Sequence, residues 1–184
     1  MITREEALLL LQKYLKNKDN INYSLTLEAV ARDFAKRLER DEEVWGLTGL
    51  LYNLDYEYTA NEPEKRGILS AMILEDLLPP NAVNAIKANN YMHTDYIPTT
   101  SLDKILIAID AAIGLIYAIA KSIPSKKIAD LDIKTLIEKF NDSSFASKYN
   151  RHKIRLCRDV GIEPEMFLGI TLNKLIQISD KLYI

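Results

Sequence analysis

The sequence is short of cysteine, histidine and glycine, and each shortage excludes a class of protein. Of its 184 residues, one is cysteine, two are histidine and six are glycine. The single cysteine, Cys157, cannot form an internal disulfide, and it fits a reducing compartment. The sequence contains no glycine-rich phosphate loop, no Ser/His/Asp or Cys/His spacing and no histidine pair at helical spacing. The common catalytic motifs are therefore missing.

Long hydrophobic runs and an excess of charge of one sign are also missing. The most apolar stretch, residues 105–120, is short for a membrane span and carries Asp110 in its middle. Charged residues stand near the N-terminus, where a signal peptide would have its apolar core. The formal net charge is -2, which does not indicate a basic surface that would bind phosphate groups. We therefore expect a soluble cytoplasmic protein that binds neither nucleic acid nor membrane.

What the sequence does contain is an ordinary globular composition with helical periodicity. Hydrophobic residues make up 48% and charged residues 27% of the chain. Apolar residues recur at steps of three and four, as at Leu27, Val30, Phe34 and Leu38. Alternating strand-like runs, internal repeats and low-complexity linkers are absent. The sequence predicts an all-α fold, a single domain over residues 1–184 built from about eight or nine helices.

Capping residues, prolines and glycines set the expected helix bounds. Thr3 and Glu6 form a capping box, Asp41 and Ser101 are expected N-caps, and Gly161 is an expected stop. A turn is expected at 20–22 and a loop at 91–100. The expected helices cover about residues 3–16, 23–39, 41–52, 63–78, 80–89, 101–122, 132–140, 144–160 and 164–182.

Several short motifs follow one another in a recognisable order. They are LEAV (27–30), DEEVWGLTGLLYNLDYE (41–57), AIKA (85–88), GLI (114–116), PSKK (124–127), FA (145–146) and NR (150–151). From about residue 23 to 180 the chain resembles the HD-domain family of His-Asp metal-dependent phosphohydrolases. The similarity is to the short bacterial members that are described as predicted hydrolases. The resemblance implies an HD-type helical bundle.

The resemblance also implies where the family's metal ligands would stand, and most of them have been replaced. The four ligand positions fall on Tyr23, Tyr52, Asn53 and Asp110, of which only Asp110 keeps a ligand type. Phenols and neutral amides cannot replace imidazoles and a carboxylate as ligands of a divalent metal. We therefore expect no metal cofactor at this site and a protein that is catalytically silent.

Two further positions at which relatives often carry histidine are Arg66 and Asn89 here. A cation at Arg66 would repel a metal ion. Arg66 could instead pair with Asp110, or it could bind a phosphate or carboxylate with its guanidinium fork. Asp110 could accept hydrogen bonds from Tyr23, Tyr52 or Asn53 and so close the former cavity, or it could orient a ligand.

The remaining candidates for ligand binding could also have purely structural roles or be exposed to solvent. Asp55 follows the lost pair and could cap a helix, form an ion pair or contact a ligand. His93 is expected in an exposed loop. Lys126 and Lys127 are expected in a solvated turn, although the family pattern suggests a place near the mouth of the cavity.

Three hypotheses about function remain open. In the first, the former active site binds a small anionic or polar molecule, such as a metabolite or nucleotide, or is simply filled. In the second, a displaced metal held by Asp110, Asp55 or Glu57 supports weak phosphohydrolase activity. In the third, the chain is a structural or partner-binding helical module. Formation of a homo-oligomer stays open in all three.

Overall fold

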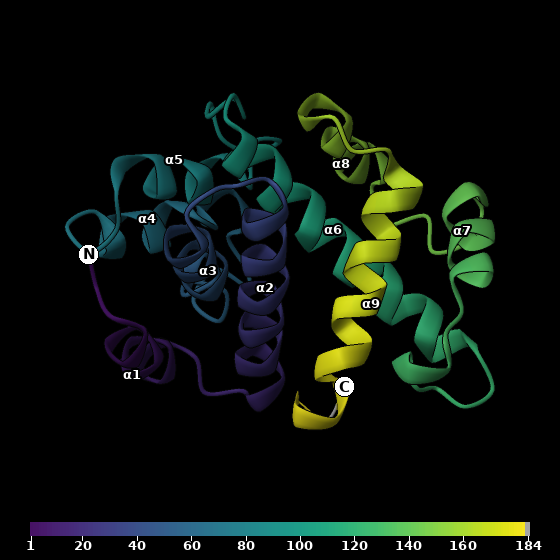
Figure 1. The fold of residues 1–184 in the computed structure, drawn as a ribbon. Helices are drawn as coiled ribbons and strands as arrows, with labels where there is room; N and C mark the ends of the chain where they lie inside the picture. The colour runs from purple at the N-terminus through teal and green to yellow at the C-terminus, as the bar shows by residue number, and fades with distance from the viewer. Residues whose placement is uncertain (183–184) are drawn as a thin grey trace. The chain divides into compact units, whose positions relative to one another are not determined.

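The computed structural model describes residues 1–182, and within them the chain is helical without any strand (Figure 1). The prediction of an all-α fold is confirmed, and the nine α-helices of these residues agree with the expected number. Three short 3-10 helices accompany them. The elements are α1 (Arg4–Tyr14), α2 (Lys18–Arg37), α3 (Glu42–Leu51), η1 (Pro63–Lys65), α4 (Ile68–Leu74), α5 (Pro80–Ala88), α6 (Ser101–Ser122), η2 (Ile128–Asp130), α7 (Ile133–Asn141), α8 (Arg151–Arg155), η3 (Leu156–Val160) and α9 (Pro164–Leu182).

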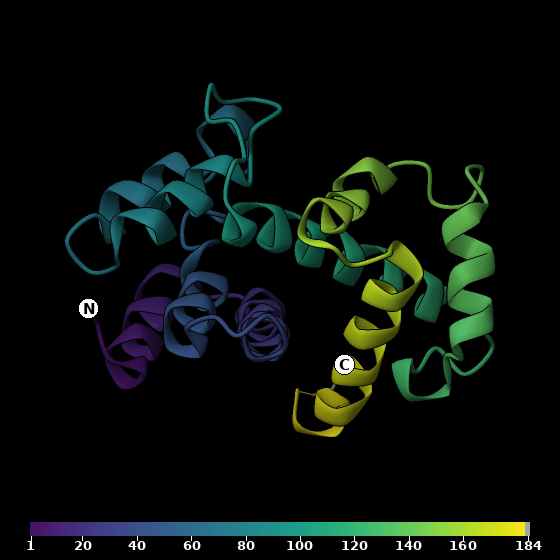
Figure 2. The same cartoon turned by 45° about the horizontal axis from the view of Figure 1, so that its top comes forward.

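The helices fall into two compact units, Met1–Leu106 and Ile107–Ile184. In the first unit, α2 packs along α3, α3 also contacts α1 and α5, and α4 packs on α5 (Figure 1). In the second unit, α9 contacts α7, η2 and η3, and Figure 2 shows α7 running beside α9. The expectation that residues 1–184 act as one domain stays a prediction.

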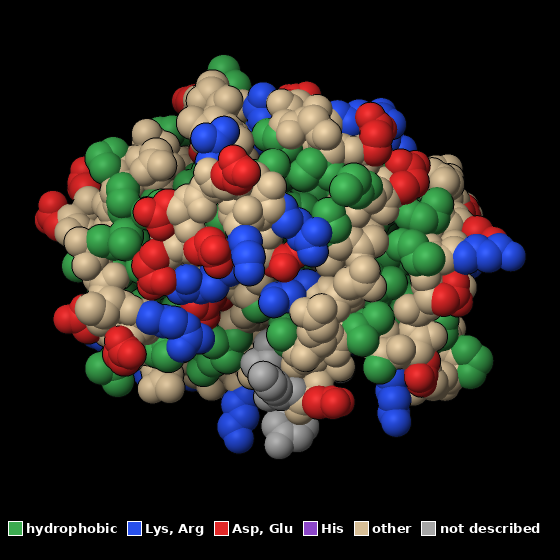
Figure 3. All heavy atoms as spheres, viewed as in Figure 1, with side chains coloured by type: hydrophobic (Ala, Val, Ile, Leu, Met, Phe, Trp, Pro, Cys, Tyr) green, Lys and Arg blue, Asp and Glu red, His purple; other side chains and the backbone are tan. Residues whose placement is uncertain are grey.

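A buried carboxylate ties the first three helices together. Glu28 on α2 accepts hydrogen bonds from Arg4 on α1 at 2.6 and 2.9 Å and from Arg32 at 3.0 Å. The side chain of Glu28 is only 4% exposed, so its charge needs these partners. Arg32 also binds Glu43 on α3 at 2.7 Å. Elsewhere on the face of α2 shown in Figure 3, acidic and basic side chains are interspersed.

The second helix begins earlier than expected. The predicted turn at 20–22 is wrong, because α2 starts at Lys18 with Asn17 as its N-cap. The Asn17 side chain accepts a hydrogen bond from the Asp19 N–H at 2.8 Å. Glu57 accepts from the backbone N–H groups of Lys16 and Asn17 at 3.0–3.1 Å. A carboxylate at the start of a helix satisfies N–H groups that lack a partner within the helix.

The predicted helix over 63–78 is broken into η1 and α4. Arg66 has an extended conformation, and Gly67 has a φ of 83°, which is in the left-handed region. A side chain at Gly67 would also bring its Cβ within 2.8 Å of the Ile86 carbonyl oxygen. Both restrictions favour glycine at this position, and they prevent a continuous helix.

The predicted helix over 144–160 is wrong in its first half, where the chain forms turns and α8 starts only at Arg151. The Arg151 side chain is 9% exposed. Its guanidinium donates to the backbone carbonyls of Phe140, Ala146, Tyr149, Lys139, Asp142 and Phe145. Because these backbone carbonyls point toward the Arg151 guanidinium, they do not line up to accept the hydrogen bonds of a continuous helix. The segment before α8 therefore forms turns.

Helix α6 is long and apolar enough to cross a membrane by length and composition alone. Its most apolar 18-residue window has a mean hydropathy of 1.9, and 67% of that window is buried. A mostly buried helix of this kind is compatible with a soluble protein.

The single cysteine of the chain, Cys157, is buried in η3, and burial raises the pKa of its thiol to about 12.

We predict that Arg151→Met lowers the free energy of unfolding by about 3 kcal/mol or more, because buried carbonyls would lose a charged donor. Urea denaturation followed by circular dichroism measures the change. Arg158 provides the control, since it forms an exposed ion pair with Glu163 at 3.1 Å. Arg158→Met should change the stability by less than about 1 kcal/mol. Equal effects of the two substitutions would contradict the assigned role of Arg151.

Candidate functional site

Seven of the ten predicted site residues lie in the Met1–Leu106 unit. They are Tyr23, Tyr52, Asn53, Asp55, Arg66, Asn89 and His93. The other three, Asp110, Lys126 and Lys127, lie in the Ile107–Ile184 unit.

The end of α3 buries the residues at which the HD-domain resemblance implies a His-Asp pair. Tyr52 is the C-cap of α3, and the turns that follow contain Asn53 and Asp55. These three side chains are 6%, 4% and 1% exposed. Helix α3 is pressed between α1, α2 and α5, and this packing holds the polar turn inside the unit.

Asp55 joins this turn to the start of α4. Its Oδ2 accepts hydrogen bonds from the backbone N–H groups of Gly67 at 2.8 Å and Ser70 at 2.9 Å. The Ser70 hydroxyl in turn accepts from the Asp55 N–H at 3.0 Å. Since Gly67 and Ser70 lie at the N-terminal end of α4, the carboxylate satisfies N–H groups that the helix leaves without partners.

Arg66 is held next to this carboxylate by backbone and ring contacts. The Asn90 side-chain amide donates to the Arg66 carbonyl at 3.1 Å and to the Pro63 carbonyl at 2.8 Å. The guanidinium carbon of Arg66 lies 4.5 Å from the centroid of the Tyr56 ring, which is a cation–π contact. Within the Met1–Leu106 unit, the Arg66 side chain forms no hydrogen bond and no ion pair.

Four buried polar atoms around these elements lack a hydrogen-bond partner. They are Asn53 Oδ1, Asp55 Oδ1, Arg66 Nε and Asn89 Oδ1. An unsatisfied buried polar atom costs on the order of 1–3 kcal/mol, so such atoms usually bind water or a ligand. We call Asn53, Asp55, Arg66 and Asn89 the polar centre.

Opposing effects act on the ionisation of Asp55. Burial raises the pKa of its carboxyl group above the ordinary value of 3.8. The hydrogen bonds from Ser70 and Gly67 and the charge of Arg66 oppose this shift without cancelling it. The polar centre thus holds one cation beside one carboxyl group whose charged form is less favourable than it is in water.

In the first unit, the residues at the ligand positions that the resemblance implies do not fit a divalent metal. Phenols at Tyr23 and Tyr52 and an amide at Asn53 are poor ligands, and Arg66 brings a positive charge. Within residues 1–182, no three His, Cys, Asp or Glu side chains are grouped so that they could hold a metal ion. The expectation of no metal cofactor nevertheless stays a prediction.

The other predicted residues have varied positions. Tyr23 is half-buried inside α2, more than one turn after its start. His93 is exposed, and its Nδ1 lies 3.1 Å from Asn90 Oδ1. Asp110 is half-buried on α6, whereas Lys126 and Lys127 are exposed in the turn before η2. Arg66 and Asp110 lie in different units, and their pairing stays a prediction.

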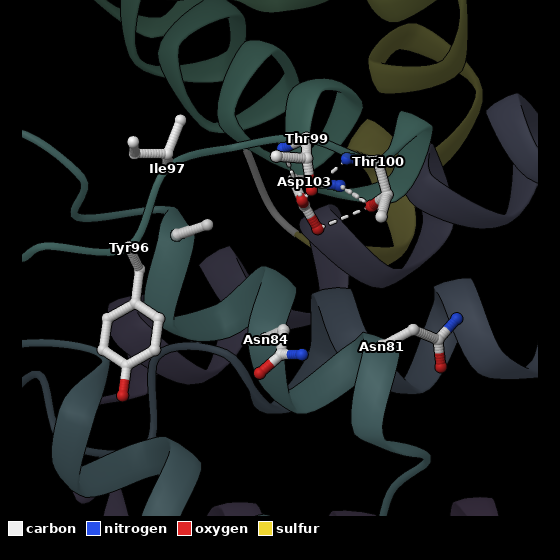
Figure 4. Close-up of a pocket in the computed structure, with 8 residues that line it drawn as sticks. Asn81, Asn84, Tyr96, Ile97, Thr99, Thr100 and Asp103 are labelled. Atoms are coloured by element: carbon white, nitrogen blue, oxygen red, sulfur yellow. Dashed lines mark hydrogen bonds between the residues drawn. The ribbon is translucent and has the colours of Figure 1, made fainter.

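Sequence reasoning missed two features of the first unit. The first is that Asn90, Ser70 and Tyr56 hold the residues of the polar centre in place. In the sequence, only Gly67, which stands before an apolar run, indicates a turn in this region. The second is a cavity of about 390 Å³ between α5 and residues 96–103, shown in Figure 4. Exposed loop residues such as Ile97 give no signal of a cavity in a sequence.

We predict that Asp55→Asn changes how stability depends on pH. Asparagine keeps an oxygen for the Gly67 and Ser70 N–H groups but does not titrate. Because the folded-state pKa of Asp55 is raised above 3.8, the wild-type folded state binds more protons than the unfolded chain between the two values. The wild type should therefore lose stability relative to the variant as the pH rises through this window.

The difference between the two proteins should become constant above the raised pKa. Urea denaturation of both proteins between about pH 3.5 and 8 measures it, and taking the difference cancels the titration of all other groups. A difference that does not change with pH, or that changes in the opposite direction, would refute the assignment.

The sequence was also compared with known proteins. No protein-family model, no curated protein and no solved structure matches it. The resemblance to the HD-domain family therefore depends on the motifs in the sequence, and it enters the following argument as a proposal.

Proposed function

We propose that this chain is a cytoplasmic, non-hydrolytic protein of the HD-domain type whose polar centre binds a small anionic molecule that carries hydroxyl groups. Sugar phosphates and nucleotides are molecules of this class. The proposal combines the sequence motifs with the hydrogen-bonding groups that the polar centre leaves unsatisfied.

The observation that carries the proposal is the unpaired guanidinium of Arg66. Its Nε is buried without a hydrogen-bond partner, and Tyr56 supports the group from one face. A guanidinium binds phosphate or carboxylate through two parallel hydrogen bonds, and such bonds are strong when water is excluded. An anion at Arg66 would supply the missing acceptor.

The other members of the polar centre favour a ligand with hydroxyl groups. Asp55 Oδ1 needs a donor, and the carboxamides of Asn53 and Asn89 can each accept or donate. Each hydroxyl group donates one hydrogen bond, so a ligand with several hydroxyl groups would supply one donor to each of these oxygens.

A displaced metal site is less well supported. Glu57 was one of its three proposed ligands, but this carboxylate accepts hydrogen bonds from Lys16, Asn17 and Asn20 at the start of α2. These bonds lower the pKa of Glu57 and stabilise it in its present place. A purely structural module is also less well supported, because it gives no reason to keep four buried polar atoms unsatisfied.

We predict that a phosphorylated sugar or a nucleotide raises the melting temperature of the full chain by about 5 °C or more when its concentration is near 100 times the Kd. Arg66→Met should abolish the shift, since the variant keeps the apolar stem but loses the guanidinium. Arg37→Met is the matched control, because Arg37 forms only an exposed pair with Asp33 at 2.7 Å.

The screen should include nucleoside mono-, di- and triphosphates, sugar phosphates and inorganic phosphate. No shift with any of them would refute binding and would indicate that the former cavity is filled. A phosphatase panel with manganese tests the alternative, for which manganese-dependent hydrolysis that disappears in Asp55→Asn would be the supporting result.

A further inference from the structure

The cavity between α5 and residues 96–103 is lined by other residues than those of the polar centre. It has a volume of about 390 Å³, within the usual range for small-molecule sites. In Figure 4, Tyr96 and Ile97 form one side, the asparagines of α5 another, and the residues at the start of α6 the third. None of the four residues of the polar centre lines it.

Two carboxamides face this cavity with unused hydrogen-bonding capacity. Asn81 and Asn84 lie one helical turn apart on α5, and both are exposed. Within the described chain, neither side chain hydrogen bonds to another residue. A carboxamide offers a donor and an acceptor side by side, which matches any ligand edge with the complementary pair.

Opposite these asparagines, the loop presents apolar surface. Ile97 is 80% exposed and Tyr96 is 41% exposed, although both are large hydrophobic residues. The Lys87 ammonium lies 5.1 Å from the centroid of the Tyr96 ring, and this contact helps to hold the ring in place. A flat apolar molecule would cover this surface.

The charges beside the cavity nearly balance, because the Lys87 ammonium lies against the Tyr96 ring while the Asp103 carboxylate is buried in the wall. Asp103 is 3% exposed, and its carboxylate accepts from Thr99 N at 2.9 Å, Thr100 N at 2.8 Å and the Thr100 hydroxyl at 2.6 Å. Because Thr100 also accepts from the Asp103 N–H at 3.2 Å, it is Thr100 and not the predicted Ser101 that caps α6. No lysine or arginine lines the cavity.

We propose that this cavity binds a neutral purine base or nucleoside that has an adenine-type edge. Asparagine pairs with adenine through the ring nitrogen N7 and the amino group on C6. The flat base would stack against Tyr96 and Ile97 while Asn84 pairs with its edge. The proposal does not depend on the proposed function, because a nucleoside has no phosphate for Arg66.

Isothermal titration calorimetry of the full chain with adenosine tests the proposal. We expect binding to one site, and we expect Asn84→Leu and Tyr96→Ala each to raise the Kd by about tenfold or more. Both residues are exposed, so circular dichroism should show an unchanged fold. Asn173→Leu, an exposed asparagine on α9, is the matched control and should bind as the wild type does.

Purine riboside, which lacks the amino group on C6, should bind about tenfold more weakly than adenosine. Arg66→Met should bind adenosine normally, which separates this cavity from the polar centre. The proposal is overturned by an absence of adenosine binding up to about 5 mM, a concentration that still detects Kd values near 1 mM. It is equally overturned if Asn84→Leu and Tyr96→Ala bind adenosine as tightly as the wild type.

Discussion

The junction between α3 and α4 in the Met1–Leu106 unit depends on the buried carboxylate of Asp55. Asp55 receives the N–H groups of Gly67 and Ser70, and this fixes the end of α3 against the start of α4. Gly67 can then turn with a positive φ, and Arg66 is carried to the edge of the same turn. The charged form of Asp55 is costly at 1% exposure, but N–H groups that a helix leaves unpaired are efficient partners for it.

The same constraint bears on the proposed HD-type relationship. The backbone around residues 52–70 is held by Asp55, Ser70 and Asn90, and none of these is a position at which the resemblance implies a metal ligand. Under our proposal, the loss of metal-binding groups at Tyr52, Asn53 and Arg66 would therefore leave this framework in place. The polar lining would then remain available for binding a small molecule.

Local signals in the sequence predict much of the fold. The Thr3–Glu6 capping box, the Asp41 cap and Pro80 mark helix starts correctly, because each acts within one turn. The break at Gly67 depends on the Asp55 side chain, which lies 12 residues earlier in the sequence. The turns before α8 depend on the Arg151 side chain, which contacts residues up to 12 positions earlier. The motifs point to Asn53, Arg66 and Asn89, but their unsatisfied state and the cavity beside Ile97 emerge only when tertiary neighbours are known.

The buried thiol of Cys157 has a practical consequence. Because burial raises the pKa of the thiol to about 12, the thiol is almost entirely protonated near neutral pH and little of the reactive thiolate is present. Since this is the only cysteine in the chain, electrophilic dyes and mild oxidants should leave the native protein untouched. Any labelling of Cys157 that does occur would report local opening around η3. The natural cysteine can therefore be used to follow unfolding in the second unit.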